Sequence, residues 1–222
     1  MIEDLISIRL TGVGRSGTTY LKQILTYLNR KELQFALNSH HDYVGKENGY
    51  ILIPCRDLRD IMVSRWRIIL SEENRYNEVE ERMMTKEEID IELEDNSIMM
   101  HQFGGIISTI NDWGENAILL DYHKFLNNPK YILSKISNIV GKDLECYVEE
   151  LEEFSFSKNK KISEKYNNFL TWGGVGIHGH HCYKGEVGGW KKYIPDQYHN
   201  YVYNKLLLIL KNHKEWKRFI QE

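Results

Sequence analysis

Residues 5–20 read LISIRLTGVGRSGTTY, and this stretch decides the fold that the sequence predicts. The first part, LISIRL, alternates between apolar and polar side chains, as a half-buried strand does. The glycine-rich segment 12–19 (GVGRSGTT) follows it, and apolar residues then recur at the spacing of one helix face through residues 21–28. A strand, a short loop of small residues and a new helix bring free N–H groups and the positive end of a helix dipole to one point. The stretch therefore predicts an anion-binding loop.

Strand and helix patterns alternate along the rest of the chain. The predicted elements are a strand at 33–37, a buried strand at 50–53, a helix at 58–70, a strand at 117–120, a helix from Pro129 to Gly141, and a last helix over 201–210. Such alternation implies right-handed crossovers, so the predicted fold class is α/β, with a mostly parallel central sheet flanked by helices. Because no Ser/Gly/Pro linker divides the sequence, we expect a single domain over residues 1–222.

The composition is that of a globular protein with nearly balanced charge. The chain has 222 residues, of which 41% are hydrophobic, and a formal net charge of −3. No apolar run approaches the ~18–20 residues that a membrane span needs. The start, MIED, is acidic where a secretory signal is basic, and Cys55, Cys146 and Cys182 form no paired motif. These features favour a cytoplasmic location.

The acidic residues are concentrated in one segment. Residues 72–95 hold eleven acids and three bases, a sum of −8, which leaves +5 for the remainder. A mildly basic body suits an anionic ligand better than a nucleic-acid duplex, so we expect no nucleic-acid partner. The segment itself allows two interpretations: a lid that selects a cationic or basic ligand, or a solvated helix face.

Three kinds of anion site use a glycine-rich loop, and they differ in the spacing of their glycines and charged residues. Two of them fit this sequence poorly. Gly12, Gly14 and Gly17 satisfy the G-x-G-x-x-G dinucleotide fingerprint, but no carboxylate follows at the end of the second predicted strand to hold a ribose. Gly12 and Gly17 also fit the nucleotide P-loop, but Thr18 occupies the place of its lysine, and the nearby cation is Arg15. A kinase would therefore lack a part that it needs.

The run Arg15-Ser16-Gly17-Thr18-Thr19-Tyr20 closely resembles the 5′-phosphosulfate-binding loop of the sulfotransferases that use 3′-phosphoadenylyl sulfate (PAPS). In that family the basic residue at the place of Arg15 contacts the bridging oxygen, and the Gly-Thr-Thr run cradles the 5′-phosphate. The resemblance implies a P-loop-like phosphosulfate-binding loop in which residues 15–20 bind PAPS. It also implies a catalytic role for Arg15, which would stabilise charge on the leaving oxygen.

Further landmarks of the family follow in order. Arg56 comes after the third predicted strand and Ser64 eight residues later, which resembles the family's 3′-phosphate motif. An arginine offers a fork of donors to a phosphate, and a serine adds a hydroxyl. The block around Tyr122 is similar to one whose tyrosine lies near the adenine, and residues 154–156 (FSF) resemble the element that places an aromatic, here Phe156, against that ring.

Residues 183–191 (YKGEVGGWK) resemble the family's Arg-Lys-Gly…Gly-Asp-Trp-Lys element, which closes over the 3′-phosphate. The resemblance implies that Lys184 and Gly185 bind PAPS and that residues 173–193 cover the nucleotide. Tyr183 stands in place of the arginine and Gly189 in place of the aspartate. Since a tyrosine supplies no full charge, we expect looser discrimination for the 3′-phosphate.

Sulfuryl transfer to a hydroxyl or amine needs a base, and histidine is the usual one. The family often places its histidine just past the strand that follows the first helix, a position that Asn38-Ser39-His40-His41 occupies. Matching the family's pattern makes His40 the general base of an in-line transfer, with His41 as the second candidate, because Asn38 replaces a lysine and leaves the register open.

Histidines also cluster in residues 178–182 (HGHHC), which allow a metal site or a glycine-rich lid. Residues this close seldom complete a tetrahedral site alone, so the lid is favoured and we expect no metal. Two alternatives to the sulfotransferase stay open: a P-loop-type phosphotransferase and a non-catalytic domain that binds PAPS or its product, 3′-phosphoadenosine 5′-phosphate (PAP). The acceptor can be a small molecule, carbohydrate, lipid or peptide, and the oligomeric state is open.

Overall fold

The computed structural model describes residues 6–31, 36–39, 43–72, 82–126, 128–166, 177, 185–213 and 215–220. The chain divides into two compact units, each built from two segments. The first unit comprises residues 1–55 and 102–159, and the second comprises residues 56–101 and 160–222. The expectation of one domain over the whole chain stays a prediction.

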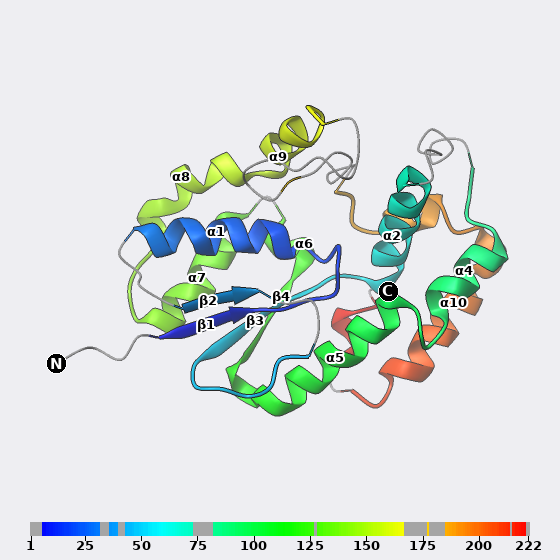
Figure 1. Cartoon of the computed structure of the whole chain (residues 1–222), viewed down its shortest axis with the longest axis horizontal. Coiled ribbons are helices and arrows are strands. Elements are labelled where there is room, and N and C mark those ends of the chain that lie inside the picture. The colour runs from blue at the N-terminus through cyan, green and yellow to red at the C-terminus, as the bar shows by residue number, and fades with distance from the viewer. Residues whose placement is uncertain are drawn as a thin grey trace. The chain divides into compact units, whose positions relative to one another are not determined.

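The first unit holds the sheet and the helices packed on it (Figure 1). Its elements are β1 (Ser7–Leu10), α1 (Thr18–Arg30), β2 (Ala36–Ser39), β3 (Tyr50–Cys55), most of α5 (Ile98–Trp113), η1 (Gly114–Asn116), β4 (Ala117–Asp121), α6 (Tyr122–Phe125), α7 (Pro129–Val140), η2 (Glu145–Tyr147), α8 (Val148–Leu151), η3 (Glu152–Phe154) and the start of α9 (Phe156–Ser163). The predicted α/β class is confirmed.

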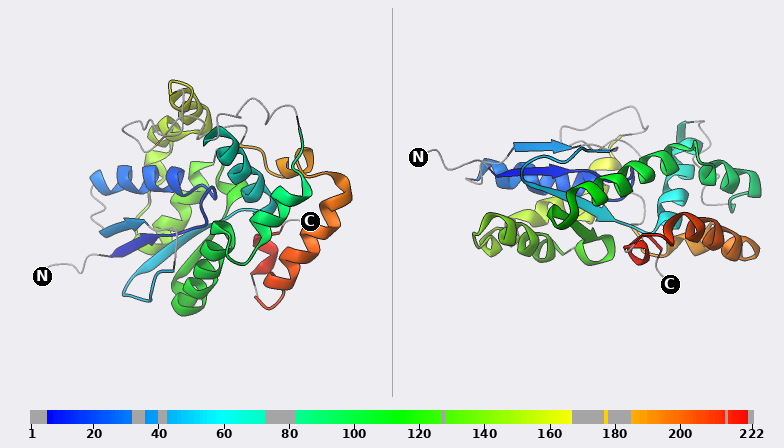
Figure 2. Two further views of the ribbon diagram at one scale, coloured as in Figure 1. Left: turned by 45° about the vertical axis from the view of Figure 1, so that its right-hand side comes forward. Right: turned by 90° about the horizontal axis from the view of Figure 1, so that it is seen from below.

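The four strands are ordered β2-β1-β3-β4, and every neighbouring pair is parallel. Strand β2 lies at one edge of the sheet (Figure 2). Leu10 is in register with Leu52 of β3 and with Ser39 of β2. The chain therefore leaves β1 and β2 at the same edge of the sheet, the carboxyl edge where parallel α/β sheets bind ligands.

The strand predicted at 33–37 continues to Ser39, two residues beyond the predicted end, and residues 32–35 lie outside the described part. Its described residues run from Ala36 to Ser39, so Asn38 and Ser39 belong to the strand and do not follow it. Pairing with Ser7–Leu10 sets these bounds. An edge strand tolerates polar residues, because one of its sides needs no neighbour.

Apolar side chains cover both faces of this sheet. Ile8, Leu10 and Leu52 pack in one cluster with α1 and α7. Strand residues alternate between faces, so Ile51 and Ile53 point away from that cluster, and both are also fully buried. Burial on both faces is the expected state of a parallel sheet, and it explains why the sequence of β3 is a continuous apolar run.

The second unit is helical in its described residues. It contains α2 (Leu58–Glu72), α4 (Lys86–Leu93), the start of α5, the end of α9, η4 (Gly189–Lys192), α10 (Asp196–Leu210) and η5 (Trp216–Arg218). Trp66 of α2 packs on Tyr193, with ring centroids 6.1 Å apart. In the described part of the chain, no helix is both long and apolar enough to cross a membrane.

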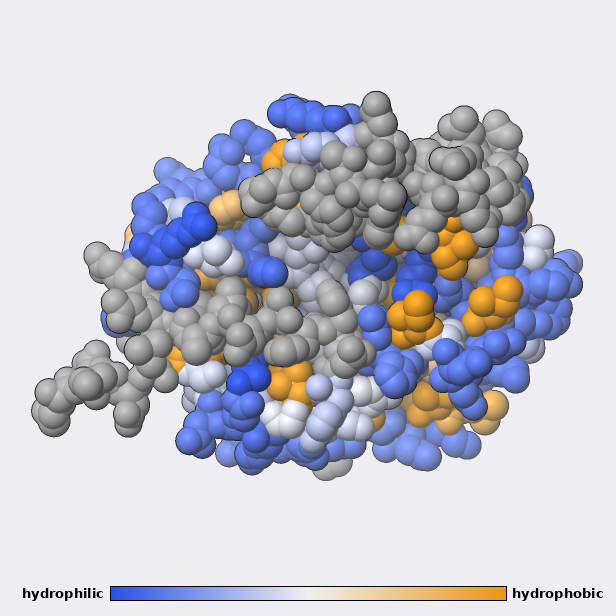
Figure 3. Space-filling model, viewed as in Figure 1, coloured by the Kyte–Doolittle hydropathy of each residue, from blue (hydrophilic) through white to orange (hydrophobic). Residues whose placement is uncertain are grey.

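The acidic segment 72–95 is described from residue 82 onward, and much of its charge is paired there. Glu88 binds Arg82 through both carboxylate oxygens, at 2.7 and 2.8 Å. Asp90 pairs with Lys86, and the buried Glu92 pairs with Arg65. Figure 3 shows hydrophobic groups at the surface around α4 among these hydrophilic ones. The pairing favours a structural role for residues 82–95, while residues 73–81 lie outside the described part.

Candidate functional site

The loop between β1 and α1 has the backbone geometry of an anion cradle. Gly17 is the N-cap of α1, with φ +97°, and no side chain among the described residues caps this helix end. The first turn of α1 contains no acidic residue. The first N–H groups of a helix lack intrahelical partners, so an anion can accept from them and also gain from the helix dipole.

Two glycines let this loop fold so tightly. A Cβ atom at Gly12 would lie 2.8 Å from Ser16 Oγ and 2.9 Å from Cγ of Pro54, which belongs to β3. A Cβ at Gly17 would lie 2.9 Å from the ring of Phe125, in addition to the strain of its positive φ. Both distances are too short for real atoms, so these two positions require glycine.

Arg15 also has a positive φ, 75°, and it is the one described non-glycine residue that does. This conformation costs an ordinary residue roughly 1 kcal/mol. An observed backbone outlier of this kind is typical of functional sites, where neighbouring structure holds it.

The buried hydroxyl of Ser16 indicates that an anionic ligand fits this loop. Its Oγ atom is buried, and no described residue is a hydrogen-bond partner for it. Its backbone N–H is used internally and donates to Val13 O at 3.1 Å. Buried hydroxyls normally have a partner, so an orphaned one beside an uncapped helix end suits a bound phosphate or sulfate oxygen. The donor set of this loop therefore fits PAPS.

An aromatic group packs against the loop. Tyr122 is buried and contacts Phe125 edge-on at 5.3 Å between ring centroids, and Tyr20 stacks on the same Phe125 at 6.2 Å. Burial raises the pKa of Tyr20 to about 12, and the charge of Glu152 adds to the shift. Tyr20 is therefore a neutral phenol at physiological pH. Tyr122 lies beside Gly17, since a Cβ there would approach its ring to 3.1 Å.

Phe156 begins α9 in the same unit and is half-buried. Its neighbour Phe154 packs edge-on against Tyr27 at 5.8 Å and belongs to the surroundings of the core cluster. Both phenylalanines are partly buried, and Phe154 packs against the core cluster. The adenine roles predicted for Tyr122 and Phe156 stay predictions.

His40 and His41 lie outside the described residues. The described chain reaches Ser39, the last residue of β2, and resumes at Tyr43. His40 therefore comes directly after a strand whose last residue is in register with Leu10, the last residue of β1. Their assignment as general base stays a prediction.

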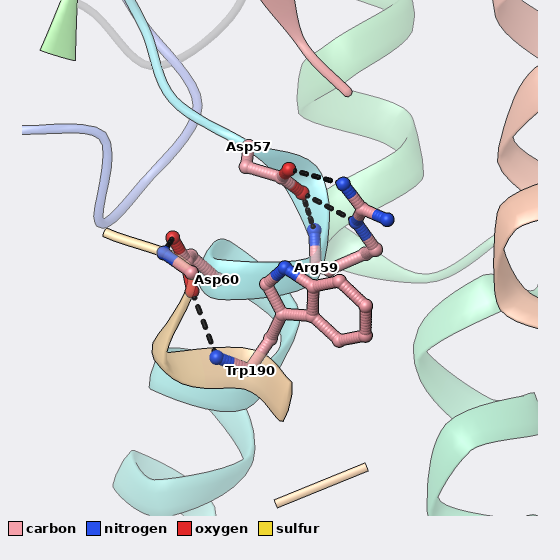
Figure 4. A network of polar contacts seen from close by, with 5 residues as sticks. Asp57, Arg59, Asp60 and Trp190 are labelled. Carbon is pink, nitrogen blue, oxygen red and sulfur yellow. Dashed lines mark hydrogen bonds and ion pairs between the residues drawn. The ribbon is translucent and has the colours of Figure 1, made fainter. Parts of the chain in front are cut away.

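In the second unit, Arg56 lies two residues before the start of α2, and Ser64 lies in the second turn of that helix. Both are partly exposed. Asp57 is buried and binds the buried Arg59 through two contacts, Nε to Oδ1 at 2.9 Å and a second guanidinium nitrogen to Oδ2 at 2.6 Å. Its Oδ1 also accepts from the Arg59 backbone N–H, as a helix cap does (Figure 4). Asp57 thus neutralises Arg59, whereas Arg56 contacts the backbone oxygen of Glu186 at 3.5 Å.

Asp60 holds the segment predicted to cover the nucleotide. Its carboxylate accepts from the backbone N–H of Gly188 at 2.8 Å and from that of Trp190 at 3.0 Å (Figure 4). Trp190 is buried, with the Arg59 guanidinium 4.1 Å from its ring centroid. Burial raises the pKa of Asp60, and the charge of Arg56 and the two hydrogen bonds oppose that rise. Gly185 is described, with φ +63°, whereas Lys184 and Tyr183 lie outside the described part.

Sequence reasoning missed the role of Asp60. The separation of 128 residues from Gly188 leaves no local signal for this contact. Among the described residues, no group of three or more His, Cys, Asp or Glu side chains could hold a metal ion. Residues 178–182 lie outside the described part, so that search does not cover the histidine cluster.

The fold and the loop together define an α/β protein with a P-loop-like anion site. A family model described as "Sulfotransferase domain" matches residues 39–206, about three quarters of the sequence. The chain belongs to this sulfotransferase family. The match begins after the glycine-rich loop, so the loop and the family model are independent observations. No curated protein sequence matches significantly.

Solved structures share the fold. Mouse sulfotransferase SULT7A1, complexed with PAP, has a TM-score of 0.67 and 14% identity, over 96% of this chain and 87% of that one. A retinol dehydratase in a complex with retinol and PAP has a TM-score of 0.64 and 14% identity, over 94% and 82% of the two chains. The resemblance of the sequence to sulfotransferases is thereby confirmed.

Proposed function

We propose that this protein is a PAPS-dependent sulfotransferase that transfers a sulfuryl group to a hydroxyl or amine. The observation that carries the proposal is the loop of residues 12–19. It combines an uncapped helix N-terminus, a buried Ser16 hydroxyl without a described partner and an arginine in a left-handed conformation. Membership of the sulfotransferase family and the PAP bound in the two similar structures support this choice of ligand.

The loop would hold the 5′-phosphosulfate end. The N–H groups of Gly17, Thr18 and Thr19 would donate to the 5′-phosphate, and the Ser16 and threonine hydroxyls would add to them. When bound, PAPS supplies an activated sulfuryl group. The Arg15 guanidinium would stabilise the negative charge that grows on the bridging oxygen as the bond to sulfur breaks. Tyr20 would stay protonated beside the loop.

Residues of the second unit would bind the 3′-phosphate. Arg56 would offer a charged fork and Ser64 a hydroxyl, and Lys184 and Gly185 would close over the phosphate. Asp60 supports this arrangement because it anchors Gly188 and Trp190, a few residues after Gly185. Tyr122 and Phe156 would contact the adenine.

His40 would act as general base, with His41 as the second candidate. As a neutral imidazole it would take the proton of the acceptor while the acceptor atom forms its bond to sulfur. Positioning and charge stabilisation account for most of the catalysis in transfers of this kind, so no metal ion is required. A cytoplasmic location belongs to the proposal, since Cys55, Cys146 and Cys182 form no paired motif in the sequence.

Calorimetric titration of PAP, with ADP as the matched nucleotide, tests this function. We expect PAP to bind at micromolar concentration or tighter and ADP at least tenfold more weakly. Arg56→Ala should weaken PAP binding about tenfold or more, because a hydrogen bond to a charged group contributes roughly 1.5–3 kcal/mol. The control Arg30→Ala, at an exposed position of α1, should leave it unchanged. Equal binding of PAP and ADP, or stabilisation by ATP with Mg²⁺ instead, would favour the phosphotransferase.

Turnover is a separate question. Incubation with labelled PAPS and a panel of a phenol, a sugar and an amine should transfer label to an acceptor. If PAP binds tightly but no labelled product or sulfate forms, the non-catalytic PAPS-binding domain becomes the better interpretation.

A further inference from the structure

Helix α5 contacts the anion loop through one side chain. The backbone N–H of Gly14 donates to Oε1 of Gln102 at 2.9 Å, although the two residues are 88 positions apart. Gly14 permits this approach, since a Cβ at that position would lie 3.2 Å from the same oxygen. The contact lies within the first unit. The bonded N–H belongs to the Val13–Gly14 peptide, so the hydrogen bond fixes the peptide group one residue before the strained Arg15.

The same helix also holds the segment that follows β2. Thr109 Oγ1 accepts from the N–H of Val44 at 2.9 Å, and Trp113 Nε1 donates to the Val44 carbonyl at 2.9 Å. Thr109 and Trp113 are both buried, and Thr109 also donates to the Gly105 carbonyl. Both backbone groups of Val44 are therefore fixed by side chains of α5.

Gln102, Thr109 and Trp113 share one face of α5. Steps of seven and eleven residues return to nearly the same direction, because a helix has 3.6 residues per turn. At a rise of ~1.5 Å per residue, Gln102 and Thr109 stand roughly 10 Å apart along the axis. One face of α5 thus forms hydrogen bonds with two segments: the loop that carries Arg15, and Val44, three residues after His41.

We infer that Gln102 is a positioning residue for sulfuryl transfer, acting through Gly14 on Arg15. This inference rests on the proposed function. A left-handed arginine returns to a relaxed conformation unless its neighbours hold it, and the Gln102 oxygen holds the Val13–Gly14 peptide at the start of the residue that precedes it. A neutral amide suits the place: it offers an acceptor oxygen to Gly14 without setting a negative charge beside a site for an anionic donor.

Two variants of similar size separate the contribution of the acceptor oxygen from that of charge. Gln102→Met removes the acceptor, and Gln102→Glu keeps an acceptor oxygen and adds a negative charge. Ser108→Ala, at an exposed position of the same helix, is the control. Three quantities are measured: amide hydrogen exchange of Gly14 in the ligand-free protein by NMR, the Kd of PAP, and the single-turnover rate of label release from PAPS with water as the acceptor.

We expect Gln102→Met to speed Gly14 exchange and to slow label release, each at least tenfold, while the Kd of PAP changes less than threefold. Gln102→Glu should show the opposite split: a release rate within threefold of the wild type once PAPS is saturating, and a Kd of PAP raised at least tenfold. A merely structural side chain would lower thermal stability and both functional quantities together, without this split.

Unchanged Gly14 exchange in Gln102→Met would overturn the inference, and so would faster exchange with an unchanged release rate. A wild-type protein that binds no PAP would count against the proposed function instead. Since the exchange measurement uses no ligand, it reports on the Gln102 contact in either case.

Discussion

The carboxylate of Asp60 accepts a hydrogen bond from the backbone N–H of Trp190 at 3.0 Å, across 130 positions of sequence. A second bond, from Gly188, makes this one side chain the anchor of the turn that begins η4. The sequence resemblance assigns residues 183–191 to closure over a phosphate. Asp60 is thus a structural residue whose loss we expect to be felt in nucleotide binding.

Asp60→Ala should lower the free energy of unfolding by about 1–3 kcal/mol, because the backbone N–H groups of Gly188, partly buried, and of Trp190, buried, both lose their acceptor. PAP should bind at least fivefold more weakly. Urea denaturation and calorimetry measure the two effects. Binding that stays at the wild-type level would show that the turn at Gly188 does not support the nucleotide.

The raised pKa of the Asp60 carboxyl should make its contribution to stability fall as pH rises. The folded state binds this proton more tightly than the unfolded chain, whose aspartates titrate near about 3.9. The contribution of Asp60 to stability therefore falls as pH rises from about 3.9 through its folded pKa. Asp60→Asn should remove this downward slope. An unchanged slope in denaturation midpoints between pH 4 and 6 would contradict the assignment.

Ser16→Ala should separate stability from binding. The Ser16 hydroxyl is buried and has no described partner, so its removal should leave the free energy of unfolding unchanged or slightly higher. The Kd of PAP should rise about tenfold if the hydroxyl serves the ligand. A stability loss above about 1 kcal/mol would instead indicate an internal hydrogen bond.

Arg15→Gly and Arg15→Ala form a second matched pair. Both remove the guanidinium, and both should slow sulfuryl release about a hundredfold or more. Glycine alone relieves the left-handed strain at φ 75°, so Arg15→Gly should be about 1 kcal/mol more stable than Arg15→Ala. Thermal denaturation of the two variants gives the difference, and equal stability would show that the conformation costs nothing.

The dependence of the free energy of unfolding on pH below about 5 should include a contribution from Glu88. Although partial burial acts in the opposite direction, hydrogen bonds from Arg82 and from the Thr85 backbone, with the charge of Arg82, lower the pKa of Glu88 to about 2. An unfolded glutamate titrates near about 4.3, so the contribution of this carboxylate is complete above about pH 4.3 and is lost as pH falls toward 2.

Glu88→Gln should therefore destabilise the protein by about 1–2 kcal/mol at pH 7, since it weakens both the capping box with Thr85 and the fork to Arg82. The difference from the wild type should shrink between pH 5 and 2.5. Glu87→Gln, at the exposed neighbouring position, is the control. A difference that does not depend on pH would rule out the lowered pKa.

His40→Ala and His41→Ala compare the two candidate bases directly. Loss of a general base costs about 10²–10⁴ in rate. We expect that loss for His40→Ala, a loss below tenfold for His41→Ala, and unchanged PAP binding for both. The reverse order of rates would move the assignment by one residue, and equal small effects would remove both histidines from the mechanism.

Local pattern was sufficient for the parts of the fold that rest on neighbouring residues. The strand, loop and helix of residues 7–30 are read correctly because apolar alternation, small residues and helical spacing each have a local cause. The predicted end of strand β2, at residue 37, falls short of Ser39, because Asn38 and Ser39 carry no apolar signal and belong to the strand through pairing with β1.

Helix α5 was not predicted at all. It contains two adjacent glycines and several β-branched residues, which disfavour an isolated helix. Burial of Phe103, Ile106 and Trp113 stabilises it instead. For the same reason the contacts of Gln102 with Gly14 and of Asp60 with Gly188 were invisible: each joins residues that only the tertiary fold brings together.

The hydrogen-bonding face of α5 has a consequence for motion. Gly14 and Val44 are both bonded to the same helix, so a small displacement of α5 carries them in the same direction and by the same amount. Thermal shifts of the helix then change the position of both segments without changing the distance between them. The rate of a transfer reaction depends on the spacing of the groups that react, and a misplacement of about 1 Å can cost a hundredfold. Because one helix holds both segments, movements of that helix disturb their relative position less than they would if each segment were held by a separate element.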